Sequence, residues 1–194
     1  MYKRQVSKVK NQGSEGYCWA FASVASMESS ILSQNDLKSK LGENPQDTID
    51  LSEAGQTWYI HSGIVDKSSP FYGDYINDSS KGSNGGTSDT LAISLNSGFG
   101  TYPQSLCPYN EVKKGFSETL RYYSDYRLKD YSEISNNKDT LKSKIVSNGA
   151  VTVYYPSFTD CYSSDYANYY SDNTCIGIGD SHLIVVVGWD DNYS

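Results

Sequence analysis

The chain has 194 residues, a net charge of −7 at pH 7 and 37% hydrophobic residues. This length supports one globular unit with a substantial core, and no stretch approaches the roughly 20 apolar residues of a membrane span. The negative charge argues against a nucleic-acid partner, because binding to phosphates calls for a basic face.

The first predicted helix covers residues 18–32. Apolar residues recur along it at three- and four-residue steps, a spacing typical of a helix buried along one face. They are Ala20, Val24, Met27 and Ile31. A thiol at the amino end of a helix lies at the positive end of the helix dipole, which favours the thiolate. Cys18 is therefore a candidate nucleophile, although a cysteine considered alone is more often a buried core residue.

A glutamine, Gln12, precedes this cysteine in a short loop that contains Gly13 and Gly16. The glycines keep the loop compact, so the Gln12 amide and the Cys18 N–H can point at the same place. Two N–H donors of this kind stabilise a developing oxyanion. The segment therefore predicts acyl-transfer chemistry.

The later helices and strands are predicted from helix-capping residues and from the spacing of apolar residues. Ser52 is the predicted N-cap of a second helix. Short apolar stripes predict helices over residues 87–97 and 138–146, the latter ended by Asn148 and Gly149. Residues 150–155 and 183–189 are predicted strands.

A histidine starts the last of these strands. His182 would lie at the rim of a sheet, where it can serve as the base that a thiol nucleophile needs. The other histidine, His61, lies in a polar stretch with no motif around it. We therefore expect His61 to be a surface residue.

The nucleophile segment resembles that of the papain-like cysteine proteases, whose signature reads Gln-Gly-x-Cys-Gly-Ser-Cys-Trp-Ala-Phe. The residues that match are Gln12, Gly13, Gly16, Cys18, Trp19, Ala20 and Phe21. The chain departs from the pattern at Glu15, where the family usually has a first cysteine, and at Tyr17, where it has a small residue.

Three further landmarks support the resemblance. Leu51-Ser52-Glu53 is similar to the family's Leu-Ser-Glu-Gln. Residues 82–86 are similar to its Gly-Cys-x-Gly-Gly, and residues 181–189 resemble the strand that carries the family's histidine. Ser83 replaces the cysteine that normally bridges to the first cysteine of the nucleophile motif, so both ends of that disulfide are missing together. Tyr59 stands where a further family cysteine would be expected.

The resemblance implies an α+β, two-lobed papain-like fold with the active-site cleft between the lobes. Residues 14–115 would form the mainly helical lobe and residues 116–194 the mainly β, barrel-like lobe. Together they make one peptidase domain, residues 6–194, that we expect to be incomplete at its carboxyl end. Residues 1–5 are a candidate for a non-native lead-in.

The resemblance also implies peptide-bond hydrolysis through a thioester. Cys18 is the nucleophile, His182 the acid and base, and Gln12 an oxyanion donor. Substrate contacts are expected from Asn84, Gly85 and Gly86, and from the neighbours of the catalytic pair. These neighbours are Trp19 and Ser181.

A papain-like site has a third member, an asparagine within an Asn-Ser-Trp segment, which this sequence lacks. Asn192 lies in a predicted turn, and we do not assign it the role of the family's asparagine. We expect the chain to be a fragment of a longer protein, and without that segment the fragment itself need not be active. The separation of Cys18 from His182 exceeds the roughly 130–150 residues typical of the family, so insertions are expected in residues 60–81 and 156–180.

We expect no cofactor or metal, because no cysteine or histidine pair has zinc-site spacing. Cys161 and Cys175 flank one loop and are the predicted disulfide. The resemblance and the acidic, tyrosine- and serine-rich composition favour a secreted or cell-surface monomer that acts on a protein or peptide. Thr87 and Leu183 lie near the expected specificity pocket, and with no acidic residue identified there we expect an apolar preference.

Two other functions stay open at this point. One is a non-catalytic papain-like module that binds peptides, and the other is a thiol acyltransferase that uses the same chemistry with an amine in place of water. The motif around Cys18 weighs against the acyltransferase.

Overall fold

A computed structural model describes residues 1–3, 5–70, 72–73, 85–96, 99–158, 162–163, 168–169 and 180–192. The chain forms an α+β structure in which helices dominate the first half and strands gather toward the carboxyl end. In chain order the elements are β1 (Tyr2–Lys3), α1 (Cys18–Ser33), α2 (Asn35–Lys38), η1 (Ser39–Leu41), α3 (Pro45–Thr48), α4 (Glu53–His61), α5 (Ser88–Asn96), η2 (Tyr109–Glu111), η3 (Glu118–Leu120), α6 (Lys138–Asn148), β2 (Val151–Ser157), β3 (Tyr162–Ser163), β4 (Asn168–Tyr169), β5 (Asp180–Val186) and β6 (Gly188–Trp189).

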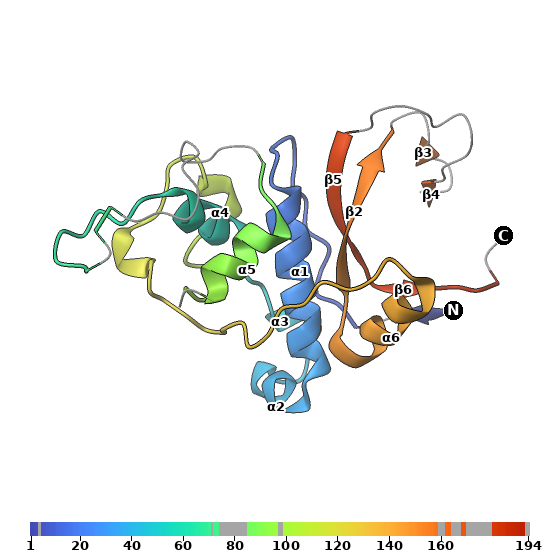
Figure 1. The fold of residues 1–194 in the computed structure, drawn as a ribbon. Coiled ribbons are helices and arrows are strands. Elements are labelled where there is room, and N and C mark those ends of the chain that lie inside the picture. Colours follow the sequence, from blue (N-terminus) through green and yellow to red (C-terminus); the bar gives the residue numbers. More distant parts are fainter. Residues whose placement is uncertain are drawn as a thin grey trace.

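The long helix α1 runs through the middle of the molecule, with α4 and α5 on one side and the strands β2 and β5 on the other (Figure 1). Buried residues of α1 belong to two hydrophobic clusters. One contains Trp19 and Ala20 with residues of α4 and α5, and the other contains Val24 and Ile31. The apolar spacing that predicted this helix thus corresponds to its packing.

The predicted N-cap of α4 is confirmed. The Ser52 hydroxyl accepts a hydrogen bond from the Gly55 N–H at 2.9 Å and donates one to the Cys107 carbonyl at 2.5 Å. A buried hydroxyl that satisfies a free N–H of the first turn stabilises the start of a helix.

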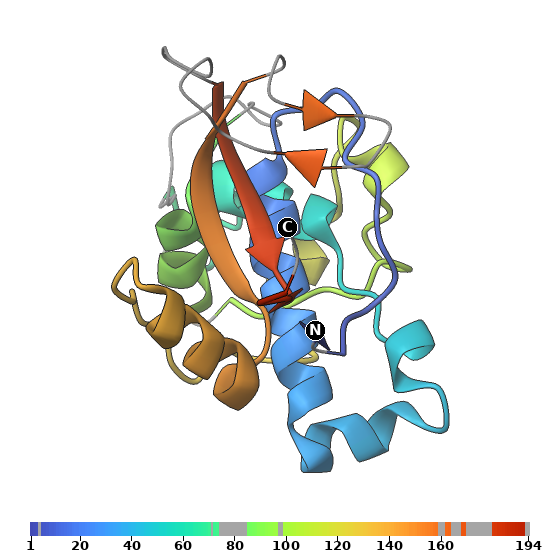
Figure 2. The ribbon, with the colours of Figure 1, turned by 90° about the vertical axis from the view of Figure 1, so that its right-hand side faces the viewer.

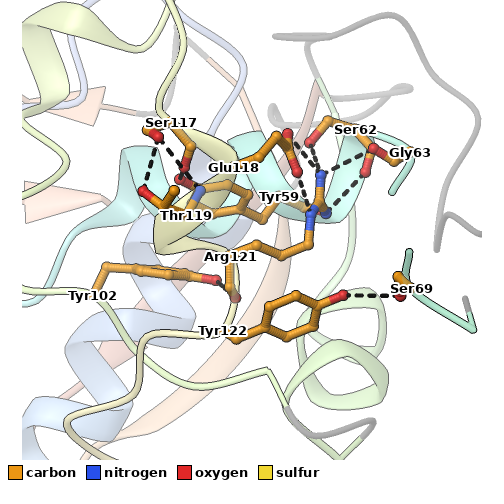
Figure 3. Close-up of polar contacts among 10 residues, drawn as sticks. All are labelled: Tyr59, Ser62, Gly63, Ser69, Tyr102, Ser117, Glu118, Thr119, Arg121 and Tyr122. Atoms are coloured by element: carbon orange, nitrogen blue, oxygen red, sulfur yellow. Dashed lines mark hydrogen bonds and ion pairs between the residues drawn. The ribbon is translucent and has the colours of Figure 1, made fainter. Parts of the chain in front are cut away.

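The carboxyl end of α4 is held by a buried arginine from the turn after η3 (Figure 3). Arg121 is 1% exposed and donates to the carbonyls of Tyr59, Ser62 and Gly63 at 3.0 to 3.2 Å. Its guanidinium also forms a bidentate pair with the Glu118 carboxylate, at 2.7 and 3.0 Å. This one side chain therefore satisfies carbonyls that the end of the helix leaves free, and the carboxylate balances its charge.

A second buried charge network ties the amino-terminal segment to α1 and α4. The Lys10 ammonium lies 3.0 Å from each of the Glu28, Glu53 and Asp50 carboxylates and donates to the Leu51 carbonyl at 2.6 Å. Glu28 and Glu53 are each 1% exposed. Burial raises the pKa of Glu53 to about 7, although the Lys10 ammonium opposes the rise. Burial alone would lower the pKa of Lys10, but the Glu53 and Glu28 charges raise it above its ordinary value.

The helix predicted over residues 138–146 is confirmed and extends two residues further. The Asn137 side chain accepts hydrogen bonds from the first turn of α6, and the helix ends before Gly149, whose φ is +108°. This left-handed conformation favours glycine, which explains the predicted stop.

The strand predicted over residues 183–189 is divided in the structure. β5 pairs antiparallel with β2, whereas β6 pairs with β1 at the amino end of the chain. A Cβ at Gly188 would lie 2.1 Å from the Tyr2 carbonyl oxygen, so the missing side chain allows β1 to approach. The Tyr2 and Trp189 rings stack there at 4.5 Å. A change of pairing partner is therefore what separates the two strands.

Figure 2 shows the β2–β5 ribbon lying across α1, with α6 beside its lower end. The Thr152 hydroxyl donates to the Ala22 carbonyl of α1 at 3.2 Å, which fixes one contact between the two layers. None of the helices in the described ranges is long and apolar enough to span a membrane. The lobe boundary at residues 115 and 116 stays a prediction.

Candidate active site

Cys18 is the first residue of α1, as predicted, and it is partly buried. Its position is fixed by the residue before it. Tyr17 is fully buried in a cluster with Ala54 and Val112, and its ring meets Tyr109 edge-on. A bulky residue where the resemblance expects a small one therefore serves as an anchor for the start of the helix.

The loop before Cys18 is held by one internal hydrogen bond and by two contacts from a distant segment. The Gln12 side-chain amide donates to the Glu15 carbonyl at 2.5 Å, and the Tyr109 hydroxyl donates to the Gln12 carbonyl at 2.8 Å. The Glu15 carboxylate pairs with Lys113 at 2.6 Å. Gln12 thus lies in a loop held at both ends and leading directly to Cys18.

The glycine pair predicted to bind substrate lies against this loop. The Gly85 N–H donates to the Gly16 carbonyl at 2.9 Å. A Cβ at Gly86 would lie only 2.5 Å from the Trp19 indole, so this position has no space for a side chain. The structure therefore brings Gly85, Gly86 and Trp19 together next to the candidate nucleophile.

His182 is the third residue of β5 and pairs with Tyr155 of β2. Its neighbour Leu183 packs against the cluster that contains Trp19, the residue after Cys18. The start of β5 and the amino end of α1 also lie at the same end of the molecule (Figure 1), and the two elements are in contact. A thiol and an imidazole are thus carried to one end of the fold by a helix and a strand that are distant in sequence.

The sequence model described as papain family cysteine protease matches residues 2–194. The chain belongs to the papain family of cysteine proteases.

Solved structures show the same papain-like fold. One is the clostridial cysteine protease Cwp84 after propeptide cleavage, with a TM-score of 0.73 and 24% identity over 97% of this chain and 42% of that one. Another contains the cysteine protease and lectin-like domains of Cwp84, described as a surface layer associated protein of Clostridium difficile, with a TM-score of 0.71 and 24% identity over 97% of this chain and 37% of that one. The chain thus spans about two fifths of the length of these structures, and the α+β papain-like fold is confirmed.

Several expected residues of the papain-type site lie outside the described residues. Asn84 does, as do Cys161 and Cys175, so their disulfide stays a prediction. Ser181 is placed by its backbone, which pairs with Pro156. Asn192 lies in an exposed turn, where its N–H donates to the Asp190 side chain at 3.0 Å.

The prediction that His61 is a surface residue is wrong. It is 4% exposed at the end of α4, and its ring meets the Trp19 indole edge-on at 5.7 Å. The prediction rested on the polar sequence neighbours of His61, but most of α4 is buried, including its polar residues. Gln56 is an example, and its side-chain amide donates to the Gly100 carbonyl at 3.1 Å. In this papain-family chain Trp19 therefore contacts both His61 and Gly86.

The remaining described cysteine, Cys107, is a free thiol with no exposure, in a cluster with Tyr59 and Tyr102. Tyr59 occupies the place of an expected family cysteine and its hydroxyl donates to the Ser117 carbonyl at 2.6 Å. Burial raises the pKa of the Cys107 thiol to about 11. At neutral pH this cysteine is therefore protonated, and its side chain is enclosed, whereas Cys18 is only partly buried.

Sequence reasoning missed two groups that support the site. Tyr109 and Lys113 reach the nucleophile loop from a segment far along the chain. Neither carries a local motif, and only the juxtaposition of two distant segments identifies them.

Proposed function

We propose that the chain is the peptidase domain of a cysteine endopeptidase that hydrolyses peptide bonds through a thioester on Cys18. The observation that carries the proposal is the grouping of Cys18 at the amino end of α1 with Gly85 and Gly86 against the same loop. The family membership supports it independently.

In this proposal the Cys18 thiolate attacks the scissile carbonyl and forms a tetrahedral intermediate. His182 protonates the leaving amine and then takes a proton from the water that hydrolyses the thioester. The contact between α1 and β5 supports this pairing.

The oxyanion would be bound by the Cys18 N–H and the Gln12 amide. As the first helical residue, Cys18 has an N–H that donates to no carbonyl within the helix. A side-chain amide has two N–H donors, and Gln12 uses one of them on the Glu15 carbonyl at 2.5 Å. The second would serve the oxyanion.

Gly85 and Gly86 would align the substrate by strand-like pairing, together with Asn84, Trp19 and Ser181. The tight approach of Gly86 to Trp19 supports this role, because backbone without a side chain leaves its N–H and C=O accessible to another chain. The substrate is then an extended protein or peptide segment, with an apolar residue preferred near Leu183.

Replacing Gly86 with alanine is expected to raise KM and to lower the free energy of unfolding by roughly 1–3 kcal/mol, because the new methyl would overlap the Trp19 indole. The measurements are steady-state kinetics on a fluorogenic peptide and urea denaturation. Gly42→Ala is the control for stability loss alone: a Cβ there meets nothing within 4 Å, but the φ of +81° disfavours alanine, so this change should lower the free energy of unfolding and leave KM unchanged. An unchanged KM in Gly86→Ala would contradict the proposal that Gly86 aligns the substrate.

We also propose that the whole protein acts outside the cell or at its surface. A similar solved structure is described as a surface layer associated protein, and the acidic composition of this chain agrees with such a location.

Mass spectrometry of the products tests the proposed reaction directly. Peptides incubated with the protein, with and without an added amine, should give new free carboxyl ends, and a peptide carrying a thiol-reactive group should label Cys18 and leave Cys107 unmodified. Amide products would favour the acyltransferase. Binding without any product or label would favour the non-catalytic module.

A further inference from the structure

The first residue of η2, Tyr109, contacts the nucleophile loop in a way that the proposed chemistry does not use. Its hydroxyl donates to the Gln12 main-chain carbonyl at 2.8 Å. Its ring meets Phe21 edge-on at 4.9 Å and Tyr17 edge-on at 6.3 Å. Because these two rings come from residues on either side of Cys18, they fix the Tyr109 hydroxyl relative to the start of α1.

The same segment contacts the loop a second time. Lys113 pairs with the Glu15 carboxylate at 2.6 Å, and the Glu15 carbonyl accepts the Gln12 amide. Residues 109–113 therefore hold both ends of the turn formed by residues 12–15. The Lys113 side chain is 72% exposed, so its ion pair contributes little. The hydroxyl of Tyr109 is the partly buried member of the two contacts.

We propose that Tyr109 is a positioning residue that holds the Gln12 backbone, and through it the Gln12 amide, at the place where the oxyanion forms. This inference rests on the proposed function. A donor of this kind acts mainly in the transition state, so a displaced amide slows the chemical step and leaves ground-state binding of the substrate unchanged.

The hydroxyl remains a donor over the working pH range of such an enzyme. Burial, with smaller contributions from Tyr17, Glu15 and Glu53, raises the pKa of Tyr109 to about 12. The contact is therefore a fixed structural feature and does not titrate near neutral pH.

The test is Tyr109→Phe, which removes the hydroxyl and keeps the ring contacts. We expect kcat on a fluorogenic peptide to fall about three- to tenfold with KM unchanged, and amide hydrogen exchange in residues 12–17 to accelerate by a similar factor. Tyr102→Phe is the matched control. Its hydroxyl also donates to a main-chain carbonyl, that of Arg121 at 2.7 Å, and its loss should change neither quantity.

A double variant separates positioning from general stabilisation. In a Gln12→Ala background, Tyr109→Phe should cause no further fall in kcat, because the donor that it positions is absent. An equal fall in both backgrounds would overturn the proposal, as would unchanged hydrogen exchange in Tyr109→Phe. If neither this chain nor the whole protein hydrolyses a peptide, the proposed function fails, and the exchange measurement still decides whether Tyr109 holds the loop.

Discussion

Cys18→Ala is expected to lower kcat/KM for peptide hydrolysis by roughly 10⁴-fold or more, because the thioester cannot form without the thiol. The fold should survive, since Cys18 is only partly buried and alanine is a good helix former. The measurement is initial-rate kinetics on a fluorogenic peptide, with circular dichroism to verify the fold.

Cys107→Ala is the matched control for this change. It removes the same sulfur atom from an enclosed site, so it should lower the free energy of unfolding by about 1 kcal/mol and leave kcat/KM within about twofold. Peptidase activity that persists in Cys18→Ala and disappears in Cys107→Ala would reverse the assignment of the nucleophile.

Lys10→Met is expected to lower the free energy of unfolding by about 3–5 kcal/mol at pH 8, since it leaves the buried carboxylates of Glu28 and Glu53 without their cation. Lys8→Met is the control. Lys8 pairs with Asp47 at 3.4 Å on the surface, with side chains 71% and 51% exposed, so its loss should cost about 0–1 kcal/mol.

The loss in Lys10→Met should also depend on pH in a defined direction. The folded-state pKa of Glu53 is raised to about 7 from 4.5, so the neutral form favours folding; this contribution is complete below pH 4.5 and is lost as the pH rises through 7. Removing the Lys10 charge raises this pKa further and steepens the loss. Urea denaturation should therefore show a smaller difference between variant and parent at pH 5 than at pH 8, and a larger difference at pH 5 would contradict the buried-charge explanation.

Local signals in the sequence predicted the helices that carry the site. The stripe after Cys18, the cap at Ser52 and the stop at Gly149 each depend on residues within a few positions, and each is confirmed. The short helices between residues 35 and 48 were missed, because four-residue turns have too few positions for a periodicity.

Contacts between distant segments could not be predicted. Lys10 contacts Glu53, 43 positions along the chain, and Tyr109 contacts Gln12, 97 positions away. The sequence of either segment contains no pattern that predicts its partner. For the same reason the burial of His61 was missed, since it depends on Trp19 and not on its polar sequence neighbours. The reactive residues are thus a prediction from the motif and its resemblance, whereas the groups that contact the nucleophile loop came only from the structure.

The link between the nucleophile loop and the glycine loop has a practical consequence for handling the protein. Where the resemblance expects two bridged cysteines, the chain has Glu15 and Ser83, and in the described residues the two loops are joined by the hydrogen bond from the Gly85 N–H to the Gly16 carbonyl. Because a hydrogen bond contains no sulfur, a reductant used to keep Cys18 as a free thiol leaves this contact unchanged. Millimolar dithiothreitol is therefore expected to keep the two loops together, although it would cleave the predicted Cys161–Cys175 disulfide.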